Sequence, residues 1–562
     1  MTWSLFSLVR SVFDACANSS VPTNKPWLPV MHKRAVLYGV ARLVQVMGLA
    51  LLPPAIIAWF DSTAETTSGI IWDPEFSGFW IAILMSLLFG TVFATIFKKN
   101  RTKQTVREGF AIVTLGWAVL ALFGSIPFFT YFVEQGADLS AYGILDAFTN
   151  SVFEIMSGFS TTGSTILTDI EAVPRGLLFW RSLTHWLGGM GIVTLALVIF
   201  PALGVSGYHM FKGEVPGPTT ERLQPRLAET ASILWGVYAL LSLAETTLLM
   251  FGGMDWFDAL CHTFGTMATG GFSTKNASVG HFQSDYIHWV IIVFMFLAGV
   301  NFLLHYNALR GNFRPWKVDR EFRFYLGVVL IAIVIGTAML YLHELPSAEY
   351  SRTHFRNDPM AYEDFATHVA DEQAKVESLY GSLKQATFQV LAIVTTTGYA
   401  TADFDVWPTT LRFMLVALMF FGGCAGSTGG GMKIIRIMIN LKAAWREIIK
   451  MARPRIIRPI KVGNLPIEEM RVGNIVSFFI LFLALTVFSS LLMTFFVPDL
   501  ETAFTSVVAC LANIGPGLSG VGSIENFAWI PIPGKWILIF NMLLGRLEIF
   551  TVLVLFRSSI WR

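Results

Sequence analysis

The sequence predicts an all-α polytopic membrane protein with four fused helix–pore-loop–helix repeats around a central pore and an N-terminal transmembrane hairpin. Residues in the hydrophobic class make up 54% of the 562 residues and charged residues only 14%, and the mean hydropathy is +0.59. A water-soluble fold cannot hide so much apolar surface. Apolar runs long enough to span a hydrocarbon core recur along the chain. A short segment ending in a Thr-Gly motif, or a variant of it, occurs four times.

The N-terminal region, residues 1–108, is expected to form a surface segment and the hairpin. The first thirty-odd residues are mixed in character and are assigned to the membrane surface. No small-residue cleavage site follows an early apolar core, so no secretory signal is expected. Apolar runs at 36–60 and 79–97 follow, and neither leads into a Thr-Gly motif. These runs are interpreted as two spanning helices ahead of the repeats.

Four repeats are expected to occupy the rest of the chain. Each has a long apolar helix, a half-helix of about three turns, a glycine-containing extended loop and a second long helix. The repeats, each with its two outer helices, are 109–227 (109–133 and 178–204), 228–319 (228–251 and 285–307), 320–469 (320–343 and 411–441) and 470–562 (470–497 and 533–557). With the hairpin they predict ten membrane crossings. An acidic insertion in the third repeat, 344–380, is expected to form an extracellular cap or loop.

The glycines that mark the four loops are Gly163, Gly270, Gly398 and Gly515. A single Thr-Gly is more often an ordinary turn or a close helix contact, but four at similar spacing favour pore loops. Extended backbone at membrane depth persists only where it is buried or lines a water-filled path. Four such loops around one axis would present carbonyl oxygens that can replace the water shell of a monovalent cation. The C-terminal ends of the half-helices would add partial negative charge there.

The distribution of charge orients the chain. Basic residues gather in the connections at 98–107, 310–323 and 442–461, which the excess of Lys and Arg assigns to the cytoplasm. The connections with the Thr-Gly motifs are acidic, with residues such as Asp403 and Glu525, and are expected outside, where they would concentrate cations. Both termini are then cytoplasmic.

A glycine cluster at 422–431 is expected to interrupt the second helix of the third repeat, because each glycine weakens a helix by about 1 kcal/mol relative to alanine. Such an interruption beneath the loops could form a movable intramembrane segment. The alternative is a Gly-rich packing face. A phosphate-binding loop is rejected, because Met432 stands where that motif needs lysine and no strand precedes it.

Two arginines lie within or beside apolar runs. Arg546 is inside the last one, where an unpaired charge is costly, so it should face the bundle interior or a cavity. The alternative is a structural ion pair with Glu548 or another carboxylate. Arg181 is expected near the outer interface, as an anchor or a half-helix partner. The four cysteines form no CxxC pair or Cys/His cluster, so free thiols are expected rather than a zinc site.

Several longer stretches resemble one family. They are Ser-Thr-Thr-Gly-Ser at 160–164, Val-Pro-Arg-Gly-Leu-Leu-Phe-Trp-Arg-Ser at 173–182, Trp-Leu-Gly-Gly-Met-Gly at 186–191, Phe-Gly-Gly-Cys-Ala-Gly-Ser-Thr-Gly-Gly-Gly-Met-Lys at 421–433 and Leu-Gly-Arg-Leu-Glu at 544–548. They closely resemble the TrkH-type potassium transporters of bacteria, in the Trk/Ktr/HKT superfamily. The resemblance spans nearly the whole chain, and the extra hairpin is similar to the Trk branch rather than Ktr.

The resemblance implies potassium uptake across the bacterial inner membrane through a channel-like pore. The selectivity filter, where the transported potassium ion would bind, would be formed by Thr161, Thr162, Gly163, Thr269, Gly270, Thr396, Thr397, Gly398, Asn513, Ile514 and Gly515. No bound organic cofactor is expected. Each loop keeps one defining glycine, which suggests looser discrimination of potassium from sodium than in TVGYG filters. The fourth loop, with Asn513-Ile514, departs most from the others.

The resemblance also implies a gate below the filter. Its residues would be Gly422, Gly423, Gly426, Ser427, Thr428, Gly429, Gly430, Gly431 and Arg546. Arg546 would project into the pore as an electrostatic constriction. The chain has no nucleotide-binding fingerprint, so nucleotide control would come from a cytosolic nucleotide-binding regulatory subunit, TrkA-like. A homodimer in contact with membrane lipid is expected, and no nucleic-acid partner.

Two other classes of function, a secondary symporter and a membrane-embedded enzyme, make different predictions about the sequence. A secondary symporter that couples a cation to another solute would have broken helices at the midplane, and it predicts two inverted repeats and intramembrane carboxylates. This chain has four parallel units and few buried acids. A membrane-embedded enzyme would need an intramembrane Asp pair or an HExxH site, and the sequence contains neither. The symporter therefore remains the alternative.

Overall fold

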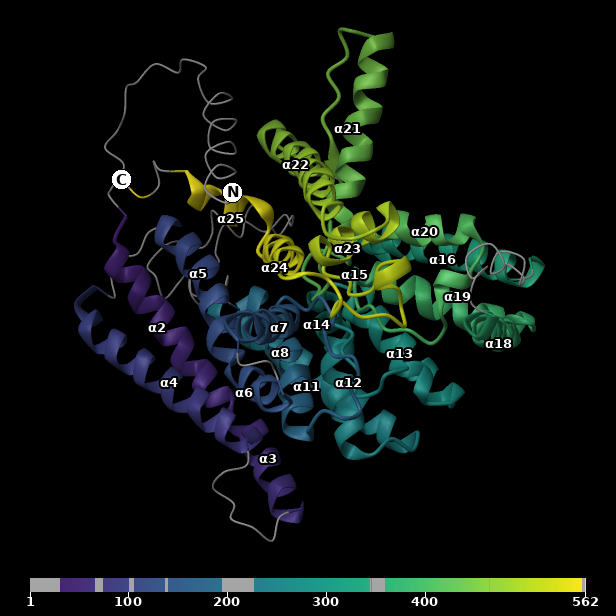
Figure 1. The fold of residues 1–562 in the computed structure, drawn as a ribbon. Helices are drawn as coiled ribbons and strands as arrows, with labels where there is room; N and C mark the ends of the chain where they lie inside the picture. Colours follow the sequence, from purple (N-terminus) through teal and green to yellow (C-terminus); the bar gives the residue numbers. More distant parts are fainter. Residues whose placement is uncertain are drawn as a thin grey trace.

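The structure, a computed structural model, describes residues 31–65, 74–100, 106–136, 140–194, 227–343, 345, 359–463, 465–557 and 561. These residues are helical or lie in loops, apart from one antiparallel ribbon of strands β1 (Lys461–Val462) and β2 (Leu465–Pro466). Figure 1 shows the helices gathered around a central region from which α21 projects. The surface segment expected at the N-terminus lies outside the described residues up to position 30.

The helices are, in chain order, α2 (Lys33–Ala50), α3 (Leu52–Glu65), α4 (Pro74–Ile96), η2 (Lys98–Asn100), α5 (Val106–Gly124), α6 (Ile126–Glu134), α7 (Ala141–Phe159), α8 (Arg175–Thr194), α11 (Leu227–Phe251), α12 (Trp256–Met267), η4 (Ser278–His281), α13 (Asp285–Ala298), α14 (Phe302–Leu309), α15 (Arg314–Val318), α16 (Arg320–Leu342), α18 (Pro359–Val376), α19 (Leu379–Val394), η5 (Phe404–Val406), α20 (Thr409–Met419), α21 (Ile434–Ala452), α22 (Glu469–Met493), α23 (Leu500–Leu511), η6 (Ser519–Val521), α24 (Ile532–Arg546), α25 (Ile549–Leu553) and η7 (Val554–Phe556).

The first helices form the hairpin that the sequence predicts. Helix α2 continues through a turn into α3 and packs along α4. The approach is close, because a Cβ added at Gly90 of α4 would lie 2.8 Å from the Ala41 carbonyl oxygen of α2. Small residues allow such contacts between membrane helices. Val36, Val40 and Val44 share a face of α2, since they are spaced by four residues, and this face is buried in a cluster with residues of α5.

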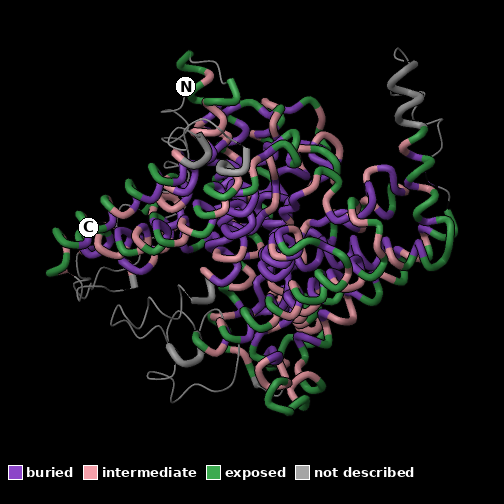
Figure 2. The backbone as a smooth tube through the Cα atoms, turned by 90° about the horizontal axis from the view of Figure 1, so that it is seen from below, coloured by how far each residue is buried: buried purple, intermediate pink, exposed green. Residues whose placement is uncertain are grey.

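Four helices, α7, α12, α19 and α23 (the short helices), each lead into an extended loop. They are 19, 12, 16 and 12 residues long, so α7 and α19 exceed the three turns expected of a half-helix. Each begins at a serine or aspartate whose side chain accepts a hydrogen bond from a backbone N–H of the first turn. These N-cap residues are Ser140, Asp255, Ser378 and Asp499. Such caps satisfy a donor that the helix start leaves unpaired. Figure 2 shows that buried residues concentrate in the middle of the molecule, and most residues of the four short helices are buried.

The structure, in the residues that it describes, does not have the ten continuous membrane-spanning helices that the sequence predicts. Six helices of the described chain are long and apolar enough to span a membrane, or eight if two bent pairs each count as one span. The prediction of continuous helices at 285–307 and 533–557 is wrong. Helix α13 meets α14 at 105°, and α24 meets the segment formed by α25 and η7 at 113°. Asn301 caps α14 at the first bend. At the second bend Glu548 has a φ of +58°, which a right-handed helix does not accommodate.

Two further outer helices were expected at 178–204 and 411–441. The first corresponds to α8, which is described as far as Thr194. The second is divided into α20 and α21 by residues 420–433, which form no helix. The glycine cluster therefore interrupts this helix, as the sequence predicts.

Large apolar side chains are exposed on the outer faces of the spanning helices. Leu88 of α4, Val334 of α16 and Val487 of α22 are each 67% exposed. Water would oppose this arrangement, whereas membrane hydrocarbon accepts it. The chain is therefore an all-helical, multi-pass membrane protein in the described residues, apart from the β1–β2 ribbon.

Helix α18, within the acidic insertion, rests on the loop that follows α19. Nε2 of His368 lies 3.0 Å from Oδ2 of Asp403, and the Asp403 N–H donates to Glu372 at 3.1 Å. The hydrogen bond to Asp403 raises the pKa of His368. Burial alone would raise the pKa of Asp403, but hydrogen bonds from His368, the Asp405 N–H and Ser523 outweigh it and lower this pKa. Residues 344 and 346–358 of the insertion lie outside the described residues.

Candidate functional site

The four short helices end in one shared backbone motif. The second residue after each helix has a positive φ, between +53° and +61°, and the next N–H donates to the carbonyl five residues earlier. The left-handed residues are Thr161, Thr269, Thr396 and Asn513, and the donors are Thr162, Gly270, Thr397 and Ile514. This is the Schellman motif, which usually has glycine at the left-handed position. Here threonine or asparagine occupies that position in every loop.

A glycine with a positive φ follows two residues later in each loop. These glycines are Gly163, Gly271, Gly398 and Gly515. In the second loop the equivalent glycine is therefore Gly271, one residue beyond the Gly270 expected from the sequence. Gly270 instead occupies the position of Thr162, Thr397 and Ile514. Sequence reasoning missed Gly271 because two adjacent glycines left the register of this loop ambiguous.

The loops meet in a closed ring in chain order. A Cβ added at Gly163 would overlap the carbonyl oxygen of Gly270 in the second loop. A Cβ added at Gly271 would overlap the Thr397 carbonyl oxygen of the third loop, and a Cβ added at Gly398 would overlap the Ile514 carbonyl oxygen of the fourth. A Cβ added at Gly515 would lie 2.9 Å from the Thr162 carbonyl oxygen of the first loop. Each glycine thus faces the backbone carbonyl of the next loop, and the fourth loop returns to the first. Backbone atoms cannot move aside as a flexible side chain can. Glycine is therefore required here both by its φ and by the space available.

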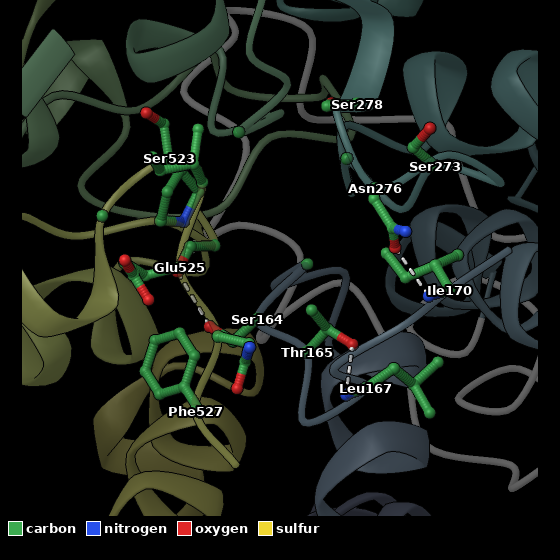
Figure 3. A pocket seen from close by; sticks show the side chains of 18 of the residues that line it. Ser164, Thr165, Leu167, Ile170, Ser273, Asn276, Ser278, Ser523, Glu525 and Phe527 are labelled. Carbon is green, nitrogen blue, oxygen red and sulfur yellow. Dashed lines mark hydrogen bonds between the residues drawn. The ribbon is translucent and has the colours of Figure 1, made fainter. Parts of the chain in front are cut away.

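The four glycines line one cavity of about 110 Å³. Its other lining residues are mostly polar, and Figure 3 shows Ser164, Thr165, Asn276 and Ser523 gathered around it. The Ser164 hydroxyl donates to the Gly515 carbonyl at 2.9 Å, which ties the first loop to the fourth. The loop residues that line it are the glycines and residues that follow them in the chain.

The charges at this cavity are mixed rather than uniformly acidic. Glu525, an acidic residue expected at the outer mouth, lines it together with Lys275 and Arg181. Lys275 lies 3.6 Å from the Asp258 carboxylate, which offsets its charge. Arg181 is paired with Glu154. The cavity is therefore lined by hydroxyl groups and charges of both signs rather than by carboxylates alone.

Arg181 and Glu154 form a buried ion pair behind the loops. Arg181 Nε lies 2.6 Å from Glu154 Oε1, and the side chains are 2% and 0% exposed. Glu154 also accepts from Thr165 Oγ1 at 3.0 Å, and Arg181 donates to the Ser273 carbonyl at 2.7 Å. The pair therefore joins the first loop to the second. Arg181 is a half-helix partner, one of the two roles expected for it, and does not lie exposed at the interface.

Asn513 links the fourth loop to its surroundings. Its Nδ2 donates to Thr162 Oγ1 at 2.9 Å and to the Met542 carbonyl at 3.1 Å. Asparagine tolerates the left-handed conformation better than threonine does. The departure of the fourth loop from Thr-Thr therefore keeps the shared backbone and adds contacts with the first loop and α24.

The glycine-rich segment, 420–433, passes beneath the loops, on the side away from the cavity. It contains all the residues expected from 422 to 431. A Cβ at Gly429 would lie 3.1 Å from the Thr395 carbonyl oxygen, and one at Gly430 would lie 2.7 Å from that of Ala512. Thr428 Oγ1 donates to the Met267 carbonyl at 2.9 Å. The segment thus contacts the C-terminal ends of α12, α19 and α23.

Arg546 clamps this segment from α24. Its guanidinium donates to the carbonyls of Thr428 at 2.9 Å and Gly188 at 2.7 Å, and the residue is 4% exposed. Glu548, the alternative partner considered from the sequence, instead binds Arg436 at 2.6 Å. The hydrogen bonds recorded for Arg546 in the described chain go to backbone carbonyls and to no carboxylate.

Comparison with known proteins gives consistent matches over nearly the full length. The family model described as "TrkH: Cation transport protein" matches residues 76–562. The Trk system potassium uptake protein TrkH of Salmonella typhimurium is 37% identical over 95% of this chain and 100% of its own length, and TrkG of Escherichia coli is 31% identical over 94% and 99%. The crystal structure of the potassium transporter TrkH from Vibrio parahaemolyticus matches with a TM-score of 0.75 and 32% identity, covering 95% of this chain and 100% of that one.

Proposed function

The chain belongs to the TrkH family of cation transport proteins, which are not enzymes, and we propose that it takes up potassium through a channel-like pore at the four Thr-Gly loops. The observation that carries the proposal is the ring closure. Four loops from distant parts of one chain place their glycines against each other's carbonyls and line one polar cavity. Potassium uptake is the activity printed in the names of the bacterial relatives.

The selectivity filter comprises the expected residues of the four loops, extended by Gly271. Carbonyl oxygens of these loops replace part of the hydration shell of the ion. The short helices direct their C-terminal ends at the ring, and the partial negative charge there favours a cation. The four repeats are proposed to run from 109 to 227, 228 to 319, 320 to 469 and 470 to 562, and their loops surround the pore axis.

The glycine-rich segment is proposed to be the gate. It lies directly under the loops, and Arg546 holds it through the Thr428 carbonyl. A permeating cation would meet the Arg546 charge below the filter, and this charge would oppose its passage. Displacement of the segment from beneath the ring would open the path.

The chain is proposed to reside in the bacterial inner membrane with both termini cytoplasmic. The basic connections support this orientation. Since the relatives are named as parts of a Trk system, we infer that the chain acts with further components. The resemblance of its motifs implies that one of them is a cytosolic nucleotide-binding regulatory subunit. A homodimer of the pore chain completes the proposed assembly.

The test is potassium-dependent growth and rubidium uptake in a bacterium that lacks its own potassium importers. Wild type is compared with Gly398→Ser, whose side chain would overlap the Ile514 carbonyl, and with Gly327→Ser as the control. A Cβ at Gly327 meets no atom within 4 Å. Rescue by wild type and Gly327→Ser, with altered cation preference in Gly398→Ser, is expected at equal expression. Folded wild type that moves no rubidium, even with the regulatory subunit, would refute the proposal and favour the symporter.

A further inference from the structure

The left-handed residues of the four loops share a backbone conformation but use their side chains differently. Thr269 Oγ1 donates to the Ala268 carbonyl, and Asn513 binds Thr162 and Met542. Thr161 Oγ1 has no hydrogen-bond partner among the described residues. Thr396 Oγ1 alone among these four side chains has a recorded hydrogen bond with the glycine-rich segment. It accepts from the Gly430 N–H at 2.7 Å, and the bond is buried.

The glycine-rich segment is attached to the protein in two groups of contacts. Its first half is fixed away from the ring, because the Cys424 N–H donates to the Gly299 carbonyl at 2.8 Å and the Ala425 N–H to Glu321 Oε1 at 2.7 Å. Its second half is held against the ends of the short helices. There Thr428 bonds to Met267 and to Arg546, and Gly430 bonds to Thr396.

Only the second group must break for the segment to leave the space beneath the ring. Gly430 packs tightly against the fourth loop, because an added Cβ would lie 2.7 Å from the Ala512 carbonyl oxygen and 2.9 Å from Asn513 Cβ. Its N–H is enclosed between the third and fourth loops. A buried N–H that loses its acceptor is costly, so the Thr396 hydroxyl stabilises the closed position specifically.

We propose that Thr396 is a positioning residue that latches the gate to the filter through its hydroxyl. The proposal rests on the function proposed above for the segment. Movement of the segment frees the side chain of a residue inside the third loop. Opening of the gate and the conformation of that loop are therefore coupled at one hydrogen bond.

The test uses Thr396→Val, which keeps the β-branched shape and removes the acceptor, and Thr396→Ser, which keeps the hydroxyl. Thr486→Val is the matched control, because Thr486 is 1% exposed against 0% for Thr396 and its hydroxyl bonds within its own helix, to the Phe482 carbonyl at 3.0 Å. The full chain is reconstituted in liposomes without any partner, and rubidium influx is measured. Hydrogen exchange of the peptide around Gly430 is measured on the same proteins.

Thr396→Val is expected to raise rubidium influx about fivefold, the population shift that corresponds to one lost buried hydrogen bond, and to accelerate exchange at Gly430. Thr486→Val should match wild type in both measurements, and Thr396→Ser, which keeps the hydroxyl acceptor, should keep the slow exchange of wild type at Gly430. Thr161→Val, at the same backbone position of the first loop, should leave exchange at Gly430 unchanged. Wild-type influx and exchange in Thr396→Val would overturn the latch, as would equal acceleration of exchange in Thr161→Val. Absence of influx in every protein, with the regulatory subunit added, would instead refute the proposed transport function.

Discussion

The ion pair of Glu154 and Arg181 allows the energetics of the ring to be measured. Glu154→Gln keeps the shape of the side chain and one acceptor oxygen but removes the charge that compensates Arg181. The guanidinium is 2% exposed and also stacks 3.6 Å from the centre of the Phe272 ring. Breaking a buried pair from one side costs about 3–5 kcal/mol, and we expect the lower end because the amide oxygen can still accept one hydrogen bond.

The control is Glu501→Gln, which removes one member of the Arg412–Glu501 pair at the surface. The Glu501 side chain is 45% exposed, so its loss should cost about 0–1 kcal/mol. Thermal unfolding in detergent compares the two variants. Sodium competition against rubidium uptake in liposomes reports the preference of the pore for potassium. Glu154→Gln should unfold at a lower temperature and admit more sodium, whereas Glu501→Gln should resemble wild type in both assays.

A double variant, Glu154→Leu with Arg181→Leu, separates stability from the positioning of the loops. Replacement of a whole buried pair by apolar residues is often neutral or stabilising, so its unfolding temperature should recover. Its preference for potassium should not recover, because the links to Thr165 and to the Ser273 carbonyl remain absent. Wild-type selectivity in the double variant, or a Glu154→Gln variant indistinguishable from Glu501→Gln, would refute the reasoning.

Three further predictions test the ring and its outer support. Gly271→Ala should abolish rubidium uptake while Gly327→Ala retains it, and normal uptake in Gly271→Ala would show that the second loop has a different register. Asn513→Ala should be less stable than Asn513→Gly by about 1–2 kcal/mol, the cost of a left-handed non-glycine residue; equal unfolding temperatures would contradict that conformation. The pKa of His368 is raised above its ordinary value of 6.5, so the contribution of its ion pair with Asp403 is complete below pH 6.5 and is lost as the pH rises through the raised pKa. Hydrogen exchange in α18, corrected for intrinsic rates, should therefore be slower at pH 6 than at pH 8, and His368→Gln should remove this difference.

Repetition in the sequence predicts the four loops, because each loop needs the same turn residues after a short buried helix. The register within a loop is harder to predict. Alignment on glycine places Gly270 with Gly163, whereas alignment on the left-handed residue, Thr269 with Thr161, gives the register of the structure. The register is therefore better predicted from the threonine at the left-handed position than from the glycine, although the Schellman motif normally has glycine at that position.

Contacts between distant residues could not be predicted from hydropathy. The bends after α13 and α24 lie in runs whose average hydropathy suits a continuous helix, and they depend on local residues such as Asn301 and Glu548. The Glu154–Arg181 pair joins residues 27 positions apart on two different helices. Two opposite charges in an apolar stretch indicate a buried pair, but only the packing of α7 on α8 shows which atoms meet.

The choice of threonine at the left-handed positions follows from what the side chains contact. Glycine would avoid a cost of about 1–2 kcal/mol per residue, and such strain persists only where the surrounding structure enforces it. Thr396 uses its hydroxyl to hold Gly430, and Asn513 uses its amide to join the fourth loop to the first; for Thr161 the described contacts give no such reason. A pore of four identical chains would have to repeat one side chain at all four positions. Fusion of the repeats in one chain lets the backbone stay fourfold while Thr396, alone among the four left-handed residues in the described contacts, bonds to the proposed gate. We therefore expect substitutions at Thr396 to alter gating and substitutions at Asn513 to alter the ring itself.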